Sequence, residues 1–338
     1  MAHHGAARQE SPKVSFLSTY AVALESLLTD PAIIEVAINP DGEVWFEKQG
    51  AVHMERASSI EPFSQRKASE LARAIASDIK HPLSSDSPSI SGKIDYKGRP
   101  LRAQIIIDPI VEMGCSITFR AYNNKKLDLA EIVLLGDGLL DLEAERQAQV
   151  AEVKRLAGEG DIKAAMAICV EQRLNIVVSG GTSTGKTTFT RALLEMIDPD
   201  ERIVTIEDAF ELFPPQRNHV CMKASRRENS PVSAAKLLEA SLRMRPDRIM
   251  LGELRGSECK TFLDAINTGH SGSFTTIHAD SGVKAIDRLA LMVMSVGINM
   301  SYGDVRRYCA STIDLVIQLG RKEGRRGVAE IAVPSEFV

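Results

Sequence analysis

The sequence predicts an α/β protein in which a domain built on a mostly parallel sheet follows a smaller α+β domain. With 338 residues, the chain exceeds the usual size of a single hydrophobic core, so two domains are expected. Helical spacing of apolar residues followed by strand-like runs is typical of an α+β unit in the first third of the chain. After Gly160, strand-like and helix-like runs alternate, which indicates parallel strands joined by crossover helices.

We expect four segments along the chain. They are a flexible N-terminus at 1–12, an α+β domain at 13–122, a linker with a helix at 123–160, and an α/β domain at 161–338. The linker is placed where the sequence becomes more charged, and the run over 142–157 is typical of an exposed helix.

Residue spacing predicts the elements of each domain. In the first domain we expect helices over 15–30 and 68–79, and strands at 33–39, 43–47, 89–95, 101–108 and 115–120. In the second we expect strands at 174–179, 202–206, 248–251, 273–277, 314–319 and 327–333, and helices from 187, over 234–244 and over 259–267. Parallel strands share one carboxyl edge, where open α/β sheets bind their ligands.

Composition favours a soluble protein of the cytoplasm. Hydrophobic residues make up 44% and charged residues 25%, as in ordinary globular proteins. The net charge of -4 gives no general attraction to nucleic acid, so direct sequence-specific nucleic-acid binding is not expected. The five cysteines are scattered singly, without CxxC pairs, which fits a reducing compartment. No signal peptide and no apolar run of about 18 residues is evident.

A phosphate-binding loop follows the strand at 174–179. Residues 180–187 read G-G-T-S-T-G-K-T and satisfy the P-loop pattern G-x-x-x-x-G-K-[ST] between a strand and a helix. Glycines let backbone N–H groups face phosphate oxygens, Lys186 adds positive charge, and the Thr187 hydroxyl is a ligand for Mg²⁺. We therefore predict a RecA-like ATPase domain that binds ATP and Mg²⁺. The expected nucleotide-binding residues are Gly180, Gly181, Thr182, Ser183, Thr184, Gly185, Lys186, Thr187 and Thr188.

Carboxylates at strand ends are the candidate catalytic acids. Glu253 ends an apolar strand and is expected to polarise the attacking water, although a solvated strand end is the alternative. Gly252 stands where many P-loop enzymes carry aspartate, so magnesium is expected to depend on Thr187 and water. Glu207 closes the strand after the P-loop helix and is a second catalytic candidate, whereas Asp208 equally suits a helix N-cap.

Two histidines bracket the strand at 273–277. His278 ends this strand, so it is expected to share the carboxyl edge with Glu207 and Glu253, whereas His270 starts on the far side. A role for His270 as a γ-phosphate sensor or subunit contact is not indicated by its position alone and depends mainly on the resemblance to a known family that is given next.

Four motifs in order resemble the secretion traffic ATPases. They are the P-loop, Thr205–Asp208, Arg245–Gly256 and Asn267–Asp280, which correspond to the Walker A, Asp, Walker B and His boxes of that superfamily. The segments 33–39 and 42–45 also resemble its N-terminal domain. Within the superfamily the chain is most similar to the VirB-type ATPases of bacterial type IV secretion and conjugation systems. Type II secretion and pilus motors commonly carry a tetra-cysteine zinc insertion, and none is found in this sequence.

The resemblance implies ATP hydrolysis that powers substrate translocation or pilus assembly. It implies a hexameric ring in the cytoplasm, peripheral to the bacterial inner membrane, that works with other secretion components on a protein or nucleoprotein substrate. It also implies catalytic contacts to the nucleotide from His270 and from two N-terminal arginines, Arg102 and Arg120. Without the resemblance, these arginines would be interpreted as solvated charges on strand ends.

Other functions remain open from the residues alone. A type II secretion or pilus motor, a RecA-like nucleic-acid motor and a nucleotide switch that barely hydrolyses would share the P-loop. Glu207 and Glu253 speak against the switch, and the acidic composition speaks against the nucleic-acid motor. The basic run at 320–327 is interpreted as a turn between the last two strands, with contact to anionic lipid as the alternative.

Overall fold

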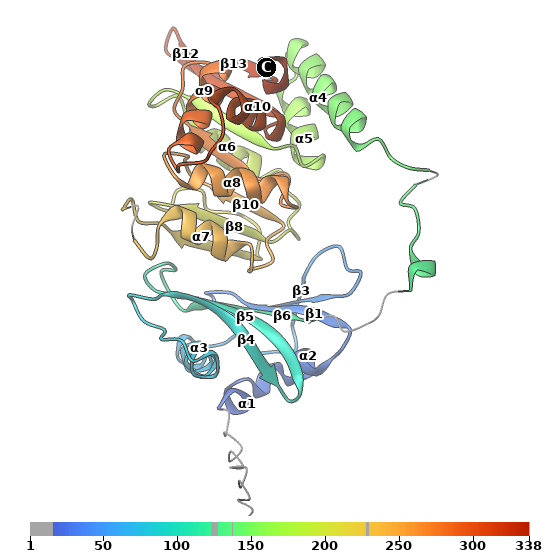
Figure 1. The fold of residues 1–338 in the computed structure, drawn as a ribbon, viewed down its shortest axis with the longest axis vertical. Helices are drawn as coiled ribbons and strands as arrows, with labels where there is room; N and C mark the ends of the chain where they lie inside the picture. The colour runs from blue at the N-terminus through green and yellow to red at the C-terminus, as the bar shows by residue number, and fades with distance from the viewer. Residues whose placement is uncertain (1–15, 123–127, 137, 228–229, 338) are drawn as a thin grey trace, which may run out of the picture.

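The computed structural model describes residues 16–122, 128–136, 138–227 and 230–337. It contains two sheets in two domains that are joined by an extended segment (Figure 1). One sheet is antiparallel and the other is parallel except for its last strand. The predicted fold class is therefore confirmed. The predicted flexible N-terminus at 1–12 lies outside the described residues.

The N-terminal domain is built on a six-stranded antiparallel sheet in the order β3-β2-β1-β6-β5-β4. Its strands are β1 (Ile33–Ile38), β2 (Val44–Lys48), β3 (Glu55–Arg56), β4 (Ser89–Tyr96), β5 (Arg99–Ile107) and β6 (Cys115–Ala121). The helices, which pack on one face of this sheet (Figure 1), are α1 (Leu17–Tyr20), η1 (Val22–Leu24), α2 (Glu25–Thr29) and α3 (Gln65–Ile79).

Two predicted helices of this domain have different outcomes. The helix α3 begins at Ser64, whose hydroxyl accepts a hydrogen bond from the Lys67 amide, and it buries Leu71 and Ile75. The helix expected over 15–30 is instead three short pieces, because the backbone leaves α-helical geometry at Ala21. Its apolar spacing still serves the core, since the side chains of Leu17, Ala21, Leu24 and Leu28 are buried.

The second domain, which the P-loop predicts to be the ATPase domain, contains a seven-stranded sheet in the order β13-β12-β7-β11-β10-β8-β9. Its strands are β7 (Ile176–Gly180), β8 (Ile203–Glu207), β9 (His219–Lys223), β10 (Arg248–Leu251), β11 (Phe274–Ile277), β12 (Leu315–Lys322) and β13 (Arg325–Ala332). Its helices are α5 (Ile162–Glu171), α6 (Lys186–Leu194), α7 (Ala234–Ser241), α8 (Glu258–Asn267), α9 (Gly282–Met294), α10 (Tyr302–Thr312) and the short η3 (Pro334–Phe337). The predicted alternation of strands and helices is present, whereas α5, β9, α9, α10 and η3 were not predicted.

The segment between the two domains contains η2 (Leu129–Glu131) and α4 (Leu142–Gly158). Most of α4 is exposed, as its charged sequence predicts, but Val150 and Val153 are buried against α5. Both helices belong to the apolar cluster that covers one face of the seven-stranded sheet. The predicted linker helix therefore packs on the ATPase domain.

The two domains are in contact along the edge strand β9. Ile106, Ile110 and Val111 of the N-terminal domain belong to the same apolar cluster as Val220 and Met222 of β9. In the same region, a backbone N–H of β9 donates to the carbonyl oxygen of the loop after β5 at 2.7 Å. Part of the ATPase core is thus completed by the N-terminal domain.

Buried polar groups complete this interface at the amino ends of the strands. The guanidinium of Arg202, directly before β8, donates to Asn39 Oδ1 at 2.7 Å and also to Asn218 Oδ1. Arg245, which precedes β10, donates from Nε to Glu47 Oε2 at 2.6 Å. Burial lowers the pKa of Arg202 to about 10. A charge held in this way is expensive to leave unpaired, so these contacts specify how the domains meet.

The pH dependence of folding is expected to change on Glu35→Gln. The Glu35 carboxylate is 4% exposed, and its burial outweighs the adjacent Arg120 charge and raises its pKa from 4.5 to about 7. The folded chain therefore binds this proton more tightly than the unfolded chain. The resulting stability is present below about pH 4.5 and is lost as the pH rises through 7.

Urea unfolding of both proteins at pH 5 and pH 8 measures this effect. The native protein is expected to lose up to about 3 kcal/mol more than Glu35→Gln between the two pH values. Equal losses in the two proteins would contradict the prediction.

Candidate active site

The P-loop runs from the end of β7 to the start of α6 with the backbone that its sequence predicts. Gly185 caps α6 at a φ of 95°, in the left-handed region that glycine adopts readily. A Cβ on Gly180 would lie 2.5 Å from Thr184 Oγ1, so only glycine fits there. Thr184 in turn donates to the Gly181 carbonyl oxygen at 2.9 Å. The loop is therefore closed by its own contacts at the amino end of α6, where helix N–H groups favour anions.

Lys186 lies at the centre of this site. Its ammonium group donates to the carbonyl oxygens of Gly180 at 2.9 Å and Gly181 at 3.1 Å. It also lies 3.3 Å from Nδ1 of His278. Burial lowers the pKa of Lys186, and the charge of Glu253 opposes this effect. The ammonium group is thus partly desolvated, which strengthens its attraction to an anionic ligand.

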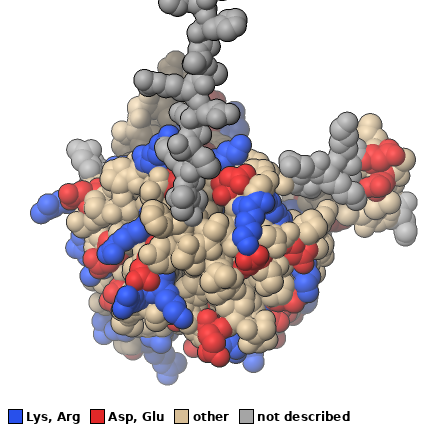
Figure 2. Space-filling view, turned by 90° about the horizontal axis from the view of Figure 1, so that it is seen from below, with Lys and Arg blue, Asp and Glu red and all other residues tan. Residues whose placement is uncertain are grey.

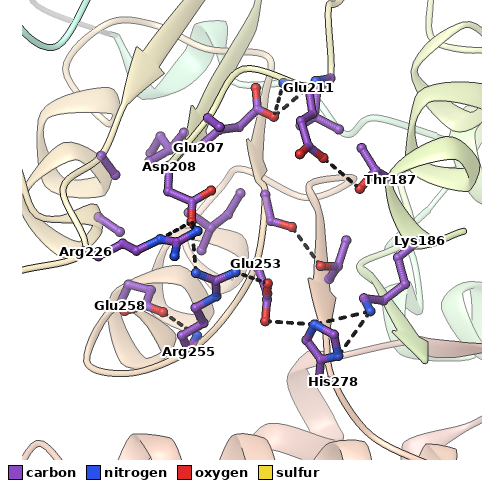
Figure 3. Close-up of a pocket in the computed structure, with 18 of the residues that line it drawn as sticks. Lys186, Thr187, Glu207, Asp208, Glu211, Arg226, Glu253, Arg255, Glu258 and His278 are labelled. Carbon is purple, nitrogen blue, oxygen red and sulfur yellow. Dashed lines mark hydrogen bonds and ion pairs between the residues drawn. The ribbon is translucent and has the colours of Figure 1, made fainter. Parts of the chain in front are cut away.

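Strand order explains why His278 stands beside Lys186. The strand β11 lies between β7, which leads into the P-loop, and β10, which leads to Glu253. His278 follows β11 at the carboxyl edge, and its Nε2 lies 3.4 Å from Glu253 Oε1 (Figure 3). Burial and the Lys186 charge lower the pKa of His278, so its neutral ring is favoured at neutral pH.

Ion pairs continue from Glu253 across the cavity (Figure 3). Arg255 donates to Glu253 Oε2 at 2.6 Å and to Asp208 Oδ2 at 2.9 Å. Arg226 donates to the same Asp208 oxygen at 2.7 Å. Burial would raise the pKa of Asp208, but these two arginines outweigh it and lower that pKa. Glu253 is thereby held in place by Arg255 while its other oxygen faces His278.

The Glu207 carboxylate accepts hydrogen bonds from residues close to it in the sequence. Its Oε1 accepts hydrogen bonds from the backbone N–H of Glu211 at 3.0 Å and of Leu212 at 3.1 Å. Its Oε2 accepts from the Thr205 hydroxyl at 3.3 Å. Burial raises the pKa of Glu207 despite these bonds. The contacts position Glu211, whose carboxylate accepts a hydrogen bond from the Thr187 hydroxyl at 3.1 Å.

These groups line a cavity of about 750 Å³ at the carboxyl edge of the sheet, a size that suits a nucleotide. Its lining offers the residues that ATP and Mg²⁺ require: P-loop N–H groups, Lys186 and the Thr187 hydroxyl. Within the described part of the chain, no group of three or more His, Cys, Asp or Glu is arranged to hold a metal. The Thr187 hydroxyl could bind Mg²⁺, with water and phosphate oxygens as further ligands.

The structure brings together many of the predicted site residues. Cavity-lining residues among them are Thr182, Ser183, Thr184, Gly185, Lys186, Thr187, Thr188, Glu207 and Glu253. Gly180 and Gly181 lie behind this lining and accept the Lys186 hydrogen bonds.

Three predicted residues lie elsewhere in this single chain. His270 precedes β11 at the amino end of the sheet, where burial lowers its pKa. Arg102 is exposed on β5, and Arg120 on β6 forms an ion pair with Glu35. None of the three lines the cavity.

Sequence reasoning left His278, Glu211, Arg226 and Arg255 out of the predicted site. For His278 the signal was its position after a strand, which predicted the correct edge of the sheet. Arg255 follows Glu253 by two residues, and such proximity at a strand end is a usable signal. Glu211 and Arg226 lie outside regular elements, so no periodic pattern indicates them.

The chain is similar to known proteins of bacterial secretion systems. Residues 140–332 match the family model described as Type II/IV secretion system protein. The type IV secretion system protein VirB11 of Bartonella quintana is 31% identical, with 94% of this chain and 93% of that protein covered. For VirB11 of Brucella suis the identity is 33%, with 88% and 83% covered.

A solved structure shows the same relationship. The VirB11 ATPase of the Brucella suis type IV secretion system, in complex with sulphate, superposes with a TM-score of 0.82. The two chains are 31% identical in this comparison, and 95% of each is covered. Sequence and structure together show that the chain belongs to the VirB11 family of type IV secretion system ATPases.

Proposed function

We propose that this chain hydrolyses ATP with Mg²⁺ and that the energy drives substrate translocation or pilus assembly by a type IV secretion or conjugation apparatus. The observation that carries the proposal is the cavity in which the P-loop faces the carboxylate of Glu253. Magnesium, when bound, neutralises phosphate charge and orients the phosphate chain.

Each residue has a defined role in this proposal. Lys186 and the P-loop N–H groups bind the phosphates, and Thr187 ligates the metal. Glu253 accepts a proton from the attacking water, while Arg255 holds it in place. Glu207 positions the segment that carries Glu211, because its oxygens are bonded to that backbone. The neutral His278 ring lies between Glu253 and Lys186 and keeps them apart.

We further propose that the active form is a hexameric ring in which Arg102 and Arg120 reach the nucleotide of another subunit. In the register of the antiparallel sheet, Lys93, Arg102 and Arg120 lie in one row that ends at Glu35. This row lies on the sheet face opposite the helices. Like charges placed side by side are unfavourable, and an anionic phosphate chain would relieve their repulsion.

The segment between the domains supports an oligomer. It carries large apolar side chains that are exposed: Leu129, Ile132, Val133, Leu134, Leu135, Leu139, Leu140 and Leu142. The side chains of Leu135 and Leu139 are more than 90% exposed. An apolar stretch of this kind marks an interaction site, and a second copy of the chain is the occupant that the ring requires.

Mixing two inactive variants tests the shared site. Lys186→Ala is expected to lose at least about a hundredfold in ATP turnover, and Arg102→Ala at least about tenfold. In a mixed oligomer some interfaces combine an intact P-loop with an intact arginine, so activity is expected to return in part. Arg102 suits this test because it forms no ion pair with a described residue, whereas Arg120→Ala would leave Glu35 unpaired.

Arg66→Ala, on the exposed face of α3, is the matched control and is expected to keep full activity. Light scattering with nucleotide should give the mass of about six chains. An Arg102→Ala protein with native turnover, or a strictly monomeric active enzyme, would contradict the proposed ring.

His270 remains a proposed subunit or domain contact. Its ring is near Arg120 and Asp247, which influence its pKa, at the amino end of the sheet. In its own chain it therefore lies far along β11 from the carboxyl-edge site, and a γ-phosphate contact would have to be made in another subunit.

The proposed location is the cytoplasmic side of the bacterial inner membrane, with other secretion components and a protein or nucleoprotein substrate as partners. Among the described residues, no helix is long and apolar enough to cross a bilayer.

A nucleic-acid motor is the second candidate. On the face of the N-terminal domain in Figure 2, basic and acidic side chains are interspersed, whereas such a motor needs a continuous basic groove.

A further inference from the structure

The hairpin of β12 and β13 carries four basic residues that the proposed function leaves without a role. They lie at its tip and are Arg321, Lys322, Arg325 and Arg326. The register places Arg321 opposite Arg326 and Lys322 opposite Arg325. Like charges directly opposite each other are destabilising. The hairpin therefore contains two successive unfavourable pairs.

The two pairs belong to different faces of the hairpin. Side chains directly opposite in an antiparallel pair share a face, and successive residues alternate between faces. Arg326 lines the nucleotide cavity, so Arg321 lies on the same face. Lys322 and Arg325 lie on the other face. The basic run is thus divided into a pair on the cavity side and a pair on the outer side.

The register of β12 explains how Arg326 reaches the cavity. Leu319 pairs with Gly180, the last residue of β7, and a Cβ on Gly180 would come within 3.0 Å of the Leu319 carbonyl oxygen. The next position of the hairpin pairs two glycines, and the Arg321–Arg326 pair follows. The arginines therefore extend past the sheet edge, level with the first residues of the P-loop.

Arg326 differs from the other arginines of the cavity in that no carboxylate among the described residues forms an ion pair with it. Arg226 and Arg255 are bound to Asp208, and Arg255 also to Glu253. Within the described ranges, no carboxylate forms an ion pair with Lys186 or Arg326, although both line the cavity. Lys186 within the P-loop and Arg326 beside it thus line the cavity without a carboxylate ion-pair partner among the described residues. They belong to different elements, since Lys186 begins α6 and Arg326 lies in β13.

We propose that Arg326, with Arg321 beside it, binds the phosphate chain of the nucleotide. Because β12 and β11 lie on opposite sides of β7, Arg326 approaches from the side opposite His278 and Glu253. A guanidinium group forms paired hydrogen bonds with phosphate oxygens, and a bound anion relieves the repulsion between the two arginines. The inference depends on the proposed ATP binding. It adds positively charged side chains on a second side of that site.

The test is the affinity of Arg326→Gln for a magnesium complex of a non-hydrolysable ATP analogue, measured by titration calorimetry. The Kd is expected to rise about tenfold or more, as for the loss of a charged hydrogen bond. Inorganic triphosphate, used as a competitor, should lose affinity by a similar factor, whereas adenosine should not. The matched control is Arg325→Gln, which removes the same charge from the outer face and should leave Kd unchanged.

Stability separates a binding role from a structural one. Since Arg326→Gln removes a like-charge contact, the Tm of the nucleotide-free protein is expected to stay the same or rise. A native Kd for Arg326→Gln, or equal losses in Arg326→Gln and Arg325→Gln, would overturn the inference. So would a loss of binding to phosphatidylserine vesicles with native nucleotide affinity, which would assign the hairpin to lipid. If the native protein itself fails to bind ATP, the proposed function fails instead.

Discussion

Lys186→Ala is expected to reduce ATP turnover by at least about a hundredfold, as the loss of a preorganised charge in an active site does. Lys186 is the cation held within the P-loop, and the folded chain already bonds it to two loop carbonyl oxygens. Alanine removes this charge, so the negative charge that develops on the phosphate is stabilised less. Phosphate release at saturating ATP measures the loss.

The fold is expected to survive this substitution. Burial lowers the pKa of Lys186, which means that the folded chain holds the charge at a cost in free energy. The Tm of Lys186→Ala should therefore not fall. Lys284→Ala, whose side chain is 67% exposed on α9, is the matched control with native turnover. Undiminished phosphate release from Lys186→Ala would refute the assignment of the active site.

Glu253→Gln is expected to lower turnover by about 10²- to 10⁴-fold with ATP affinity nearly unchanged, because a general base contributes to the chemical step. Glutamine keeps the size of the side chain and can still accept a hydrogen bond from Arg255, but it cannot take a proton from water. Binding and turnover should consequently separate. Titration with ATP and single-turnover hydrolysis measure the two quantities independently.

Two further variants make this result specific. Glu239→Gln, exposed on α7, is the matched control and should keep native turnover. Glu207→Gln disturbs hydrogen bonds to the backbone at 211 and 212, so it should lower Tm as well as turnover. Native turnover in Glu253→Gln, together with an inactive but stable Glu207→Gln, would transfer the role of general base to Glu207.

Much of the site was predictable because its residues follow a local rule. The P-loop pattern fixes glycines, Lys186 and Thr187 within eight consecutive residues, and Glu253 follows an apolar strand. Such residues reach the carboxyl edge through the parallel arrangement alone. The contact between His278 and Lys186 needs more information, because it depends on β11 lying between β7 and β10. Strand order is decided by long-range packing, which periodicity does not report.

The missed elements have a similar explanation. The sequence of α5 is apolar on nearly all sides between Ala164 and Val170, so it lacks the polar face by which an amphipathic helix is recognised. It is apolar because α4 covers the side that the sheet does not. The strand β9 has buried side chains at alternate positions over five residues, and the N-terminal domain supplies part of its cover. In both cases the residues that cover the element belong to another segment of the chain, so the pattern within the element does not reveal it.

The strands β8 and β10 connect the domain boundary to the chemistry. An arginine bonded to the N-terminal domain precedes each strand: Arg202 directly before β8, and Arg245 in the turn that leads into β10. A carboxylate of the cavity lies at or just after the other end of each strand, Glu207 or Glu253. Strands of four or five residues span only about 15 Å, and neighbouring strands in a buried sheet do not stretch. The two strands thus form a short, stiff link through the protein, and a rotation of the N-terminal domain would be transmitted to both carboxylates through them.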